Sequence, residues 1–247
     1  MGRYDRIAEL ADLNTTGPAP LEVADLAAGY GRLTRTVLAR SRGPVRVHAL
    51  DTACTLDDDV LHDERVRSVV ADPDAAMPFR DASLDRVLSV NVAEHLPEAR
   101  EHVADCFRVL RPGGLLVLAH SDWDTALFTS ENDTLTRRLV DRFVAAFPHW
   151  AERADGFMGR KLLGLADAAP FTVQGVETWA DCHRRFDVES VAWKVARGVV
   201  AAAADDTELA TASAEWFRGL QRLAGEGRFL FTVTDVAVVL RRPPEQG

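Results

Sequence analysis

Cysteine is scarce in this chain, and the spacing of its cysteines excludes several classes of protein. Cys54, Cys106 and Cys182 are far apart, and no CxxC pair is present. Neither a zinc knuckle nor a disulfide framework is therefore expected. A sparse, odd set of cysteines is typical of proteins kept in a reducing compartment, which predicts a cytoplasmic location.

Long hydrophobic runs are missing as well. The start of the chain, MGRYDRIAELADL, is charged and amphipathic and lacks the apolar core of a signal peptide. The richest apolar stretch, residues 195–204, falls well short of the roughly 18 residues that a membrane-spanning helix requires. The sequence therefore predicts no interaction with a membrane.

Positive charge is also in short supply. The 247 residues contain 29 Lys and Arg against 38 Asp and Glu, which gives a formal net charge of −9. Proteins held by phosphate contacts usually present a basic face, so a nucleic-acid partner is not expected. The composition is otherwise that of a globular protein large enough to bury its own core. A monomer or a homodimer is expected.

Hydrophobic runs alternate with helical patterns in the first half of the chain, which is typical of a βαβ sheet. Strands are predicted at residues 21–26, 45–50, 66–71, 84–91 and 115–120, with helices at 32–40, 55–63 and 97–110. The RPGG sequence at 111–114 predicts a turn. In the second half, helices are predicted at 134–147, 161–168, 187–204 and 208–225, and strands at 171–179 and 229–240.

These elements predict an α/β fold: a Rossmann-like, seven-stranded, mostly parallel sheet with helices on both faces and a helical substrate lid. We expect a single domain over residues 1–247, with its cofactor-binding core at about 20–120, lid and substrate elements at about 121–228 and a final strand at about 229–240. A plain dinucleotide-binding domain has six parallel strands followed by a substrate domain, for which too little chain remains.

A glycine-containing loop joins the first predicted strand to the next helix. Its sequence, DLAAGYG, spans residues 25–31. Glycine lets the backbone approach a ligand closely, and the start of the helix adds a positive dipole end. A tight turn without a ligand would look the same, so the loop alone is weak evidence.

Acidic residues end the next two predicted strands. Asp51 follows the loop by about twenty residues, a position from which a carboxylate can accept both hydroxyls of a ribose. Asp72 can accept the exocyclic amine of an adenine. Each has a plainer interpretation, a helix N-cap for Asp51 and Asp-Pro turn chemistry for Asp72. Together with Asp25, however, they place carboxylates at three successive strand ends, which lie on the ligand side of an open parallel sheet.

In combination, these segments resemble the class I S-adenosylmethionine-dependent methyltransferases. DLAAGYG, ALD, ADPDAAMPFRDASLDRVLSVNVAEHL and FRVLRPGGLLVL are similar to successive motifs of that family over residues 21–120. The small-molecule members related to quinone biosynthesis are the most similar group. The resemblance implies S-adenosylmethionine as cofactor and N- or O-methylation of a small molecule, of the kind found in secondary metabolism.

The resemblance also implies roles for individual residues. It assigns the methionine part of the cofactor to Asp25 and the glycine loop, the ribose to Asp51 and the adenine to Asp72. The implied cofactor contacts are Asp25, Ala27, Ala28, Gly29, Gly31, Asp51, Thr52, Ala71, Asp72, Pro73, Asn91 and Val92. Ala27 stands where the family has its first motif glycine. Because alanine favours negative φ, the loop is expected to sit slightly differently.

Two histidines are candidate bases. In methyl transfer from a sulfonium the protein mainly aligns and desolvates the reactants, so a base is needed only when the nucleophile begins protonated. His95 follows the fourth predicted strand and His120 ends the fifth. Either is equally well explained as a packing or capping residue.

A metal site is not expected. Residues 91–95 resemble a Glu-x-x-Glu-His pattern that binds a divalent cation in some quinone-pathway O-methyltransferases. The first position here is Asn91, and a neutral amide is a poorer ligand for a hard cation.

Five further residues are candidates for substrate binding. Glu94, Trp123 and Asp124 would shape the acceptor cavity, and Arg160 would meet an anionic group. Tyr4 would close over the cofactor from the first helix. Core packing for Trp123, a helix cap for Asp124 and a solvated basic patch for Arg160 are the alternatives.

Two other functions stay open. An NAD(P)-dependent Rossmann oxidoreductase is disfavoured because its third fingerprint glycine would fall at Thr34. A non-catalytic cofactor-binding protein would carry the same strand-end residues.

Overall fold

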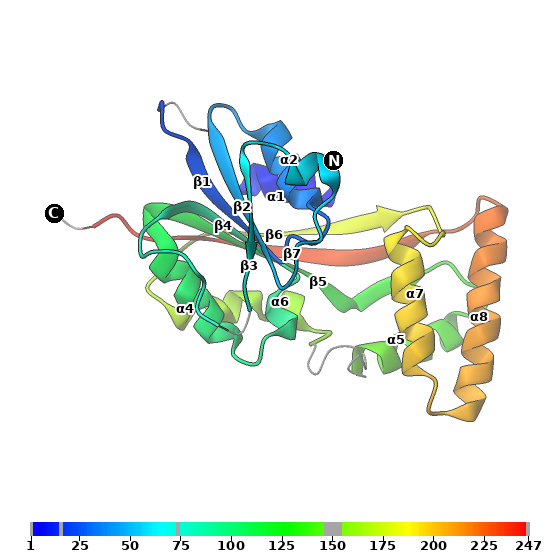
Figure 1. Ribbon diagram of the computed structural model, residues 1–247. Coiled ribbons are helices and arrows are strands. Elements are labelled where there is room, and N and C mark those ends of the chain that lie inside the picture. Colours follow the sequence, from blue (N-terminus) through cyan, green and yellow to red (C-terminus); the bar gives the residue numbers. More distant parts are fainter. Residues whose placement is uncertain (1, 15–16, 73–74, 146–154, 246–247) are drawn as a thin grey trace. The chain divides into compact units, whose positions relative to one another are not determined.

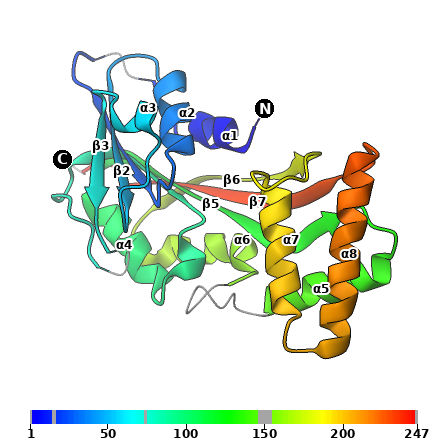
Figure 2. The same ribbon diagram turned by 45° about the vertical axis from the view of Figure 1, so that its right-hand side comes forward.

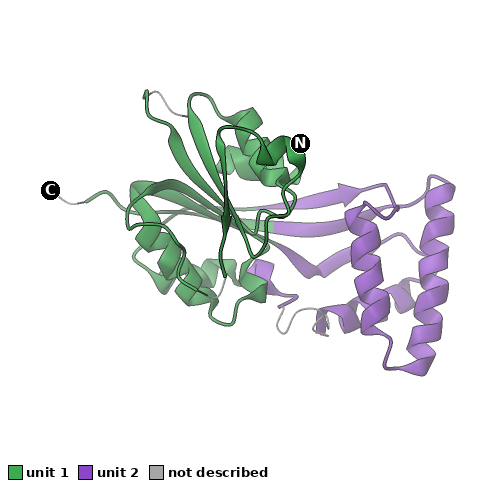
Figure 3. Ribbon diagram, in the orientation of Figure 1, with its two compact units in different colours: residues 1–120, 161–177, 236–247 green, residues 121–160, 178–235 purple. Residues whose placement is uncertain are grey.

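A seven-stranded sheet organises the protein, with the strand order β3-β2-β1-β4-β5-β7-β6 (Figure 1). The computed structural model describes residues 2–14, 17–72, 75–145 and 155–245. The chain divides into two compact units (Figure 3), here called unit 1 (residues 1–120, 161–177 and 236–247) and unit 2 (residues 121–160 and 178–235). Strands β5 (Leu110–Phe128), β6 (Thr172–His183) and β7 (Phe231–Arg241) contribute residues to both.

The sheet of unit 1 reverses its order beside β1. Strands β1 (Leu21–Leu26), β2 (Val45–Asp51) and β3 (Val66–Val70) succeed one another in one direction, and the chain then returns to place β4 (Leu84–Val90) on the other side of β1. The pairs from β3 through to β5 are all parallel. Ligands of open α/β sheets bind at the carboxyl ends of the strands at such a reversal, which here lies between β1 and β4.

Helices cover both faces of the unit 1 sheet (Figures 1 and 2). Helices α1 (Arg3–Leu10), α2 (Arg32–Arg40) and α3 (Asp58–Leu61) lie on one face, and α4 (Ala99–Val109) lies on the other. Amphipathic spacing explains their orientation, since α4 buries positions 103, 106 and 109 against the sheet. The central strands carry fully buried residues, with Val23, Val47 and Leu88 at 0% exposure, whereas most of the edge strand β3 is exposed.

Unit 2 has a core of its own, formed by α5 (Asp133–Ala145), α7 (Val191–Ala202) and α8 (Thr207–Gly225). Aromatic rings occupy its centre: the ring centroid of Phe128 lies 4.6 Å from that of Phe231 in a tilted arrangement and 5.2 Å from that of Trp216 in an edge-on one. The buried Trp216 indole donates a 3.0 Å hydrogen bond to Thr136 Oγ1. Side-chain caps start two of the helices, at Ser190 for α7 and at Asp206 for α8.

The predicted seven-stranded α/β sheet is confirmed, and most element bounds agree within a few residues. Three predictions were wrong in detail. The predicted helix at 55–63 is only Asp58–Leu61, and the one at 161–168 is split into α6 (Met158–Lys161) and the 3-10 helix η2 (Leu162–Ala168). RPGG does not end the element before β5. It lies within β5, where the pairing passes from Leu84↔Leu110 to Arg86↔Leu115 through an irregularity.

Strand β5 also continues well beyond His120, where the apolar run ends. The reason is that the polar residues that follow have partners in the fold. Ser121 Oγ donates a 2.7 Å hydrogen bond to Asp235 Oδ1, and Asp122 pairs with Arg160. A paired polar group is tolerated inside a sheet, so polarity alone did not mark the strand's end.

Residues 146 and 147, the predicted end of the helix at 134–147, lie outside the described residues. Among the described helices, none combines the length and apolar character required to cross a membrane. The single domain over 1–247 stays a prediction.

Candidate cofactor and acceptor site

The glycine loop follows β1 at the reversal of the sheet. Ala27, Gly29 and Gly31 all have positive φ, at 57°, 52° and 80°. Ala27 thus adopts the left-handed conformation that glycine adopts freely, and the steric cost falls on its Cβ. Asp25, in β1 just before the loop, is 2% exposed and accepts a 2.6 Å hydrogen bond from Thr34 Oγ1. Burial raises the pKa of Asp25 to about 7, against the lowering effect of Thr34.

Asp51 connects the end of β2 to this loop. Its Oδ2 accepts a 2.8 Å hydrogen bond from the backbone N–H of Gly29, and its Oδ1 accepts one of 2.7 Å from that of Thr52. Ala28 N–H also donates to the carbonyl of Leu50 at 3.1 Å. The carboxylate is therefore held in one orientation at the strand end.

A cavity opens at the carboxyl ends of β1, β2 and β3. Of the predicted cofactor residues, it brings together Ala27, Asp51, Thr52, Ala71, Asp72 and Val92, and its other lining residues are Leu26, Leu50, Ala75, Met77 and His102. Apolar walls with carboxylates at the rim suit a nucleoside, whose base is flat and whose sugar carries hydroxyls. The other predicted residues, Asp25, Ala28, Gly29, Gly31 and Asn91, do not line this cavity, and Pro73 lies outside the described residues.

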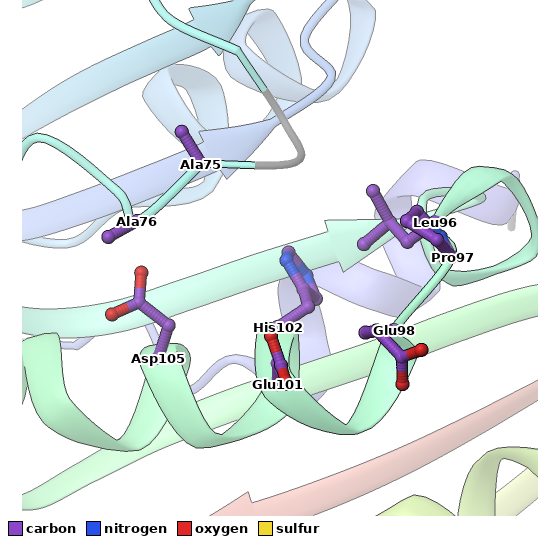
Figure 4. Close-up of a pocket in the computed structure, with 8 residues that line it drawn as sticks. All are labelled: Ala75, Ala76, Leu96, Pro97, Glu98, Glu101, His102 and Asp105. Carbon is purple, nitrogen blue, oxygen red and sulfur yellow. The ribbon is translucent and has the colours of Figure 1, made fainter.

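His102 was missed by the sequence analysis. It lies on the inward face of α4 beside Val103 and Cys106, a spacing that indicates core packing. Its Nε2 lies 3.1 Å from Ser89 Oγ, and burial lowers its pKa to about 4, so the imidazole is neutral. His102 and Ala75 also line a second cavity, whose other lining residues are Ala76, Leu96, Pro97, Glu98, Glu101 and Asp105 (Figure 4). No sequence signal separated this histidine from a core position.

The two candidate bases share one carboxylate. Glu94 Oε1 lies 3.2 Å from His95 Nε2 and 3.4 Å from His120 Nε2. Burial would raise the pKa of Glu94, but His120 and His95 outweigh it and lower that pKa to about 2. The His120 side chain is 0% exposed and that of His95 is 45% exposed. His95 is therefore the imidazole that a substrate can reach, and the ionised Glu94 orients it.

The candidates in unit 2 are tied into an ion-pair cluster. Arg160 donates two hydrogen bonds to the buried Asp122, from Nε at 2.7 Å and from Nη2 at 2.8 Å. Its Nη2 also donates at 2.9 Å to Asp124 Oδ2. Asp124 also pairs with Arg137 at 2.7 Å, and Arg160 is the main cause of its lowered pKa. Because the Arg160 guanidinium already has two carboxylate partners, its role toward an anionic substrate stays a prediction.

The remaining candidates for substrate binding, Trp123 and Tyr4, are both partly buried in the protein. Trp123 packs edge-on against Phe143, with ring centroids 6.3 Å apart, and its backbone N–H donates at 3.0 Å to the carbonyl of Gly156. Tyr4 is half-buried on α1. Neither observation tests a contact with substrate.

Gly31 should tolerate no side chain. A Cβ there would lie 2.9 Å from Val60 Cγ1 and 3.1 Å from Leu56 Cδ2, at a φ of +80°. We expect Gly31→Ala to lower the free energy of unfolding by about 2–3 kcal/mol, from overpacking and left-handed strain combined. Gly29→Ala is the matched control, because its φ is also positive but nothing lies within 4 Å of the added Cβ. Equal losses in urea unfolding would contradict the packing argument.

The sequence matches a known family over this region. Residues 24–118 match the family model described as "Methyltransferase domain". An uncharacterized 37.1 kDa protein in a transposon of Streptomyces fradiae is 29% identical over 172 residues, which cover 68% of this chain and 46% of that protein. An uncharacterized methyltransferase of Mycobacterium avium is 52% identical over 48 residues, 19% of each chain. The matches thus span half or less of the length of these curated relatives.

Solved structures share the fold over nearly the whole chain. The YcgJ protein of Bacillus subtilis matches with a TM-score of 0.59 at 14% identity, covering 98% of both chains. A geranyl diphosphate methyltransferase, solved with GPP and sinefungin, matches at 0.55 and 15% identity, covering 97% of this chain and 76% of that one. The [4+2]-cyclase SpnF matches at 0.56 and 16% identity, covering 98% and 81%.

Residues 24–118 therefore match a methyltransferase domain, in agreement with the class I S-adenosylmethionine-dependent family that the sequence motifs resemble. The prediction of family and fold is confirmed, while the relation to quinone biosynthesis stays a prediction.

Proposed function

We propose that the protein transfers the methyl group of S-adenosylmethionine to a small-molecule acceptor. The observation that carries this proposal is the cavity at the ends of β1, β2 and β3, where Asp51 is held against the glycine loop and Asp72 lies at the rim. Asp51 would bind the ribose hydroxyls and Asp72 the adenine amine, with Val92 and Met77 packing on the base. Asp25 and the loop residues Ala27, Ala28, Gly29 and Gly31 would hold the methionine part.

The cofactor, when bound, supplies a methyl group on a positively charged sulfur that leaves readily. The chain's own residues then have to align the acceptor, exclude water and remove a proton where the acceptor carries one. We assign that proton to His95 Nδ1, because its Nε2 faces Glu94 and its side chain is half exposed. Glu94, whose Oε1 also lies 3.4 Å from His120 Nε2, would stabilise the imidazolium that forms.

An acceptor with a protonated oxygen or nitrogen fits this arrangement best. The exposed His95 has a use only if the nucleophile must lose a proton, which a hydroxyl or an ammonium does. The net charge of −9 argues against a nucleic-acid acceptor. The name of the geranyl diphosphate methyltransferase with this fold supports a small organic acceptor.

The proposal is tested by methyl transfer itself. Protein incubated with methyl-labelled S-adenosylmethionine and a panel of phenols, amines and carboxylic acids should release S-adenosylhomocysteine in step with a labelled product. Tight binding of S-adenosylhomocysteine with no transfer to any acceptor would favour the non-catalytic alternative, because a fold alone does not determine function.

His95→Ala should lower kcat by about a hundredfold or more, the usual contribution of a general base, and leave the affinity for S-adenosylhomocysteine unchanged. His62→Ala, at an exposed histidine of the α3 C-terminus, is the matched control and should behave as wild type. An unchanged kcat in His95→Ala would remove His95 from the proposed reaction and leave the cofactor site intact.

A further inference from the structure

Strand β6 forms one edge of the sheet, and within the described part of the chain it has a neighbouring strand, β7, on one side only. It is 12 residues long, whereas β3, at the other edge, has 5. An edge strand carries a row of backbone N–H and C=O groups that no strand pairs with, and proteins usually keep such strands short or place lysine or proline on them. The β6 sequence contains neither lysine nor proline. It is therefore a long edge that can accept a further strand.

The side chains of β6 alternate between an exposed face and a partly covered one. Between positions 176 and 182, every even-numbered residue is exposed and every odd-numbered residue is partly buried. The exposed residues Thr178, Ala180 and Cys182 are small and carry no charge at neutral pH. A strand that pairs with this edge therefore meets no bulky side chain on this face and has no charge there to desolvate.

The two carboxylates of β6 lie on its partly covered face and have partners within their own chain. Glu177 Oε2 accepts a 2.7 Å hydrogen bond from Nη2 of Arg6. Asp181 Oδ2 lies 3.0 Å from His183 Nε2. Both acidic side chains are therefore held by their own chain, on the face away from the small exposed residues.

The order of residues along β6 suits pairing with a second copy of itself. In a two-fold symmetric dimer the same surface is used on both copies, so residue i faces residue j and j faces i. If two β6 strands pair antiparallel with Ala180 at the axis, Thr178 lies opposite the partner's Cys182. Glu177 then lies opposite the partner's His183, an acidic residue across from a basic one. Small residues meet at the axis, and no like charges face each other.

The two neighbouring registers of the same symmetry are less favourable. An axis at Asp181 would put that carboxylate directly opposite its own copy. An axis at Trp179 would put Glu177 opposite the partner's Asp181. Like charges directly opposite each other destabilise an antiparallel pair. The charges of β6 therefore favour the axis at Ala180 over both.

We propose that two copies of this chain associate through β6, paired antiparallel about a two-fold axis at Ala180. The occupant of the edge is a second copy, because β6 is complementary to itself in side-chain size and in charge. Backbone hydrogen bonds across the axis would satisfy the outward N–H and C=O groups of both edges. This inference is independent of the proposed function, since no residue of β6 lines the cofactor cavity.

A disulfide that forms in one register only tests the arrangement. Directly opposite residues of an antiparallel pair have Cα atoms about 4.5–5.5 Å apart, a distance that a disulfide spans. Thr178→Cys, oxidised in air, should therefore form a covalent dimer through the partner's Cys182. Within one strand, positions 178 and 182 are about 13 Å apart and cannot bond. A gel without reductant shows the dimer, and mass spectrometry identifies the linked peptides.

Gln174→Cys is the matched control for the disulfide. Gln174 is also exposed on β6, but it lies opposite the partner's Cys182 only if the axis is at Thr178. The Gln174→Cys chain should therefore form no disulfide with Cys182.

The mass of the protein in solution tests the association itself. Multi-angle light scattering of the unmodified chain should give twice the mass of one chain. Ala180→Lys places two like charges at the axis and should give the mass of a single chain. Val70→Lys adds the same charge to an exposed position of β3, at the other edge of the sheet, and should remain a dimer.

Every other outcome overturns the proposal. A wild-type chain that is monomeric at all concentrations has no such interface. A dimer that Ala180→Lys leaves intact, or that Val70→Lys dissociates equally well, does not depend on the β6 edge. A dimer in which Thr178→Cys fails to link to the partner's Cys182, or in which Gln174→Cys links instead, does not have its axis at Ala180.

Discussion

Asp51→Ala is expected to weaken the binding of S-adenosylhomocysteine by at least about a hundredfold. A carboxylate that accepts two ribose hydroxyls makes two charged hydrogen bonds, each worth about 1.5–3 kcal/mol, and a hundredfold change in affinity corresponds to about 2.7 kcal/mol. Asp51 also holds the N–H groups of Gly29 and Thr52, so the loop loses part of its support in the same variant. Titration calorimetry gives the affinity directly.

Two further variants separate ribose binding from support of the loop. Asp51→Asn keeps one oxygen to accept the Gly29 hydrogen bond but loses the charge, and should give an intermediate loss. Asp57→Ala removes an exposed carboxylate that pairs with Arg35 at 3.0 Å, outside the cavity, and should bind as wild type. An Asp51→Ala protein that remains folded and keeps wild-type affinity would contradict the placement of the ribose.

Asp25→Asn is expected to change how stability depends on pH. Burial raises the pKa of Asp25 from 3.8 to about 7, so between these values the folded protein holds a proton that the unfolded chain has lost. The contribution of Asp25 to the free energy of unfolding of the wild type therefore falls as the pH rises from about 4 to about 7. From pH 5 to pH 8 the wild type should lose about 2–3 kcal/mol relative to Asp25→Asn, which has no proton to lose.

Urea unfolding at several pH values measures this difference. Asp59→Asn is the control, because the hydrogen bond from Arg35 lowers the pKa of Asp59 below 3.8, and its titration lies outside the window. The stability difference between Asp59→Asn and wild type should therefore be constant from pH 5 to pH 8. A constant difference for Asp25→Asn as well would mean that Asp25 is ionised throughout, despite its burial.

The candidate site residues that the structure brings to one cavity are those whose positions are set by local order. Asp51, Thr52, Ala71, Asp72 and Val92 line one cavity because each ends or follows a strand of a parallel sheet, and parallel strands end at the same edge. The positions of these strands could be predicted because each is a run of apolar residues bounded by short loops. Their roles toward the cofactor stay predictions that the titrations above test.

The parts that the sequence did not predict depend on pairings between distant positions. Asp122 pairs with Arg160, 38 residues away, and Ser121 with Asp235, 114 residues away. These contacts allow β5 to continue through polar residues, and no local sequence pattern predicts them. His102 was missed for a different reason, because its spacing on α4 marks it as a core residue.

The most direct test of the account is a calorimetric titration of the whole, unmodified chain with S-adenosylhomocysteine. The account predicts saturable binding with micromolar affinity and one ligand per chain. No binding by a folded sample, or binding of NAD(P) in its place, would contradict it.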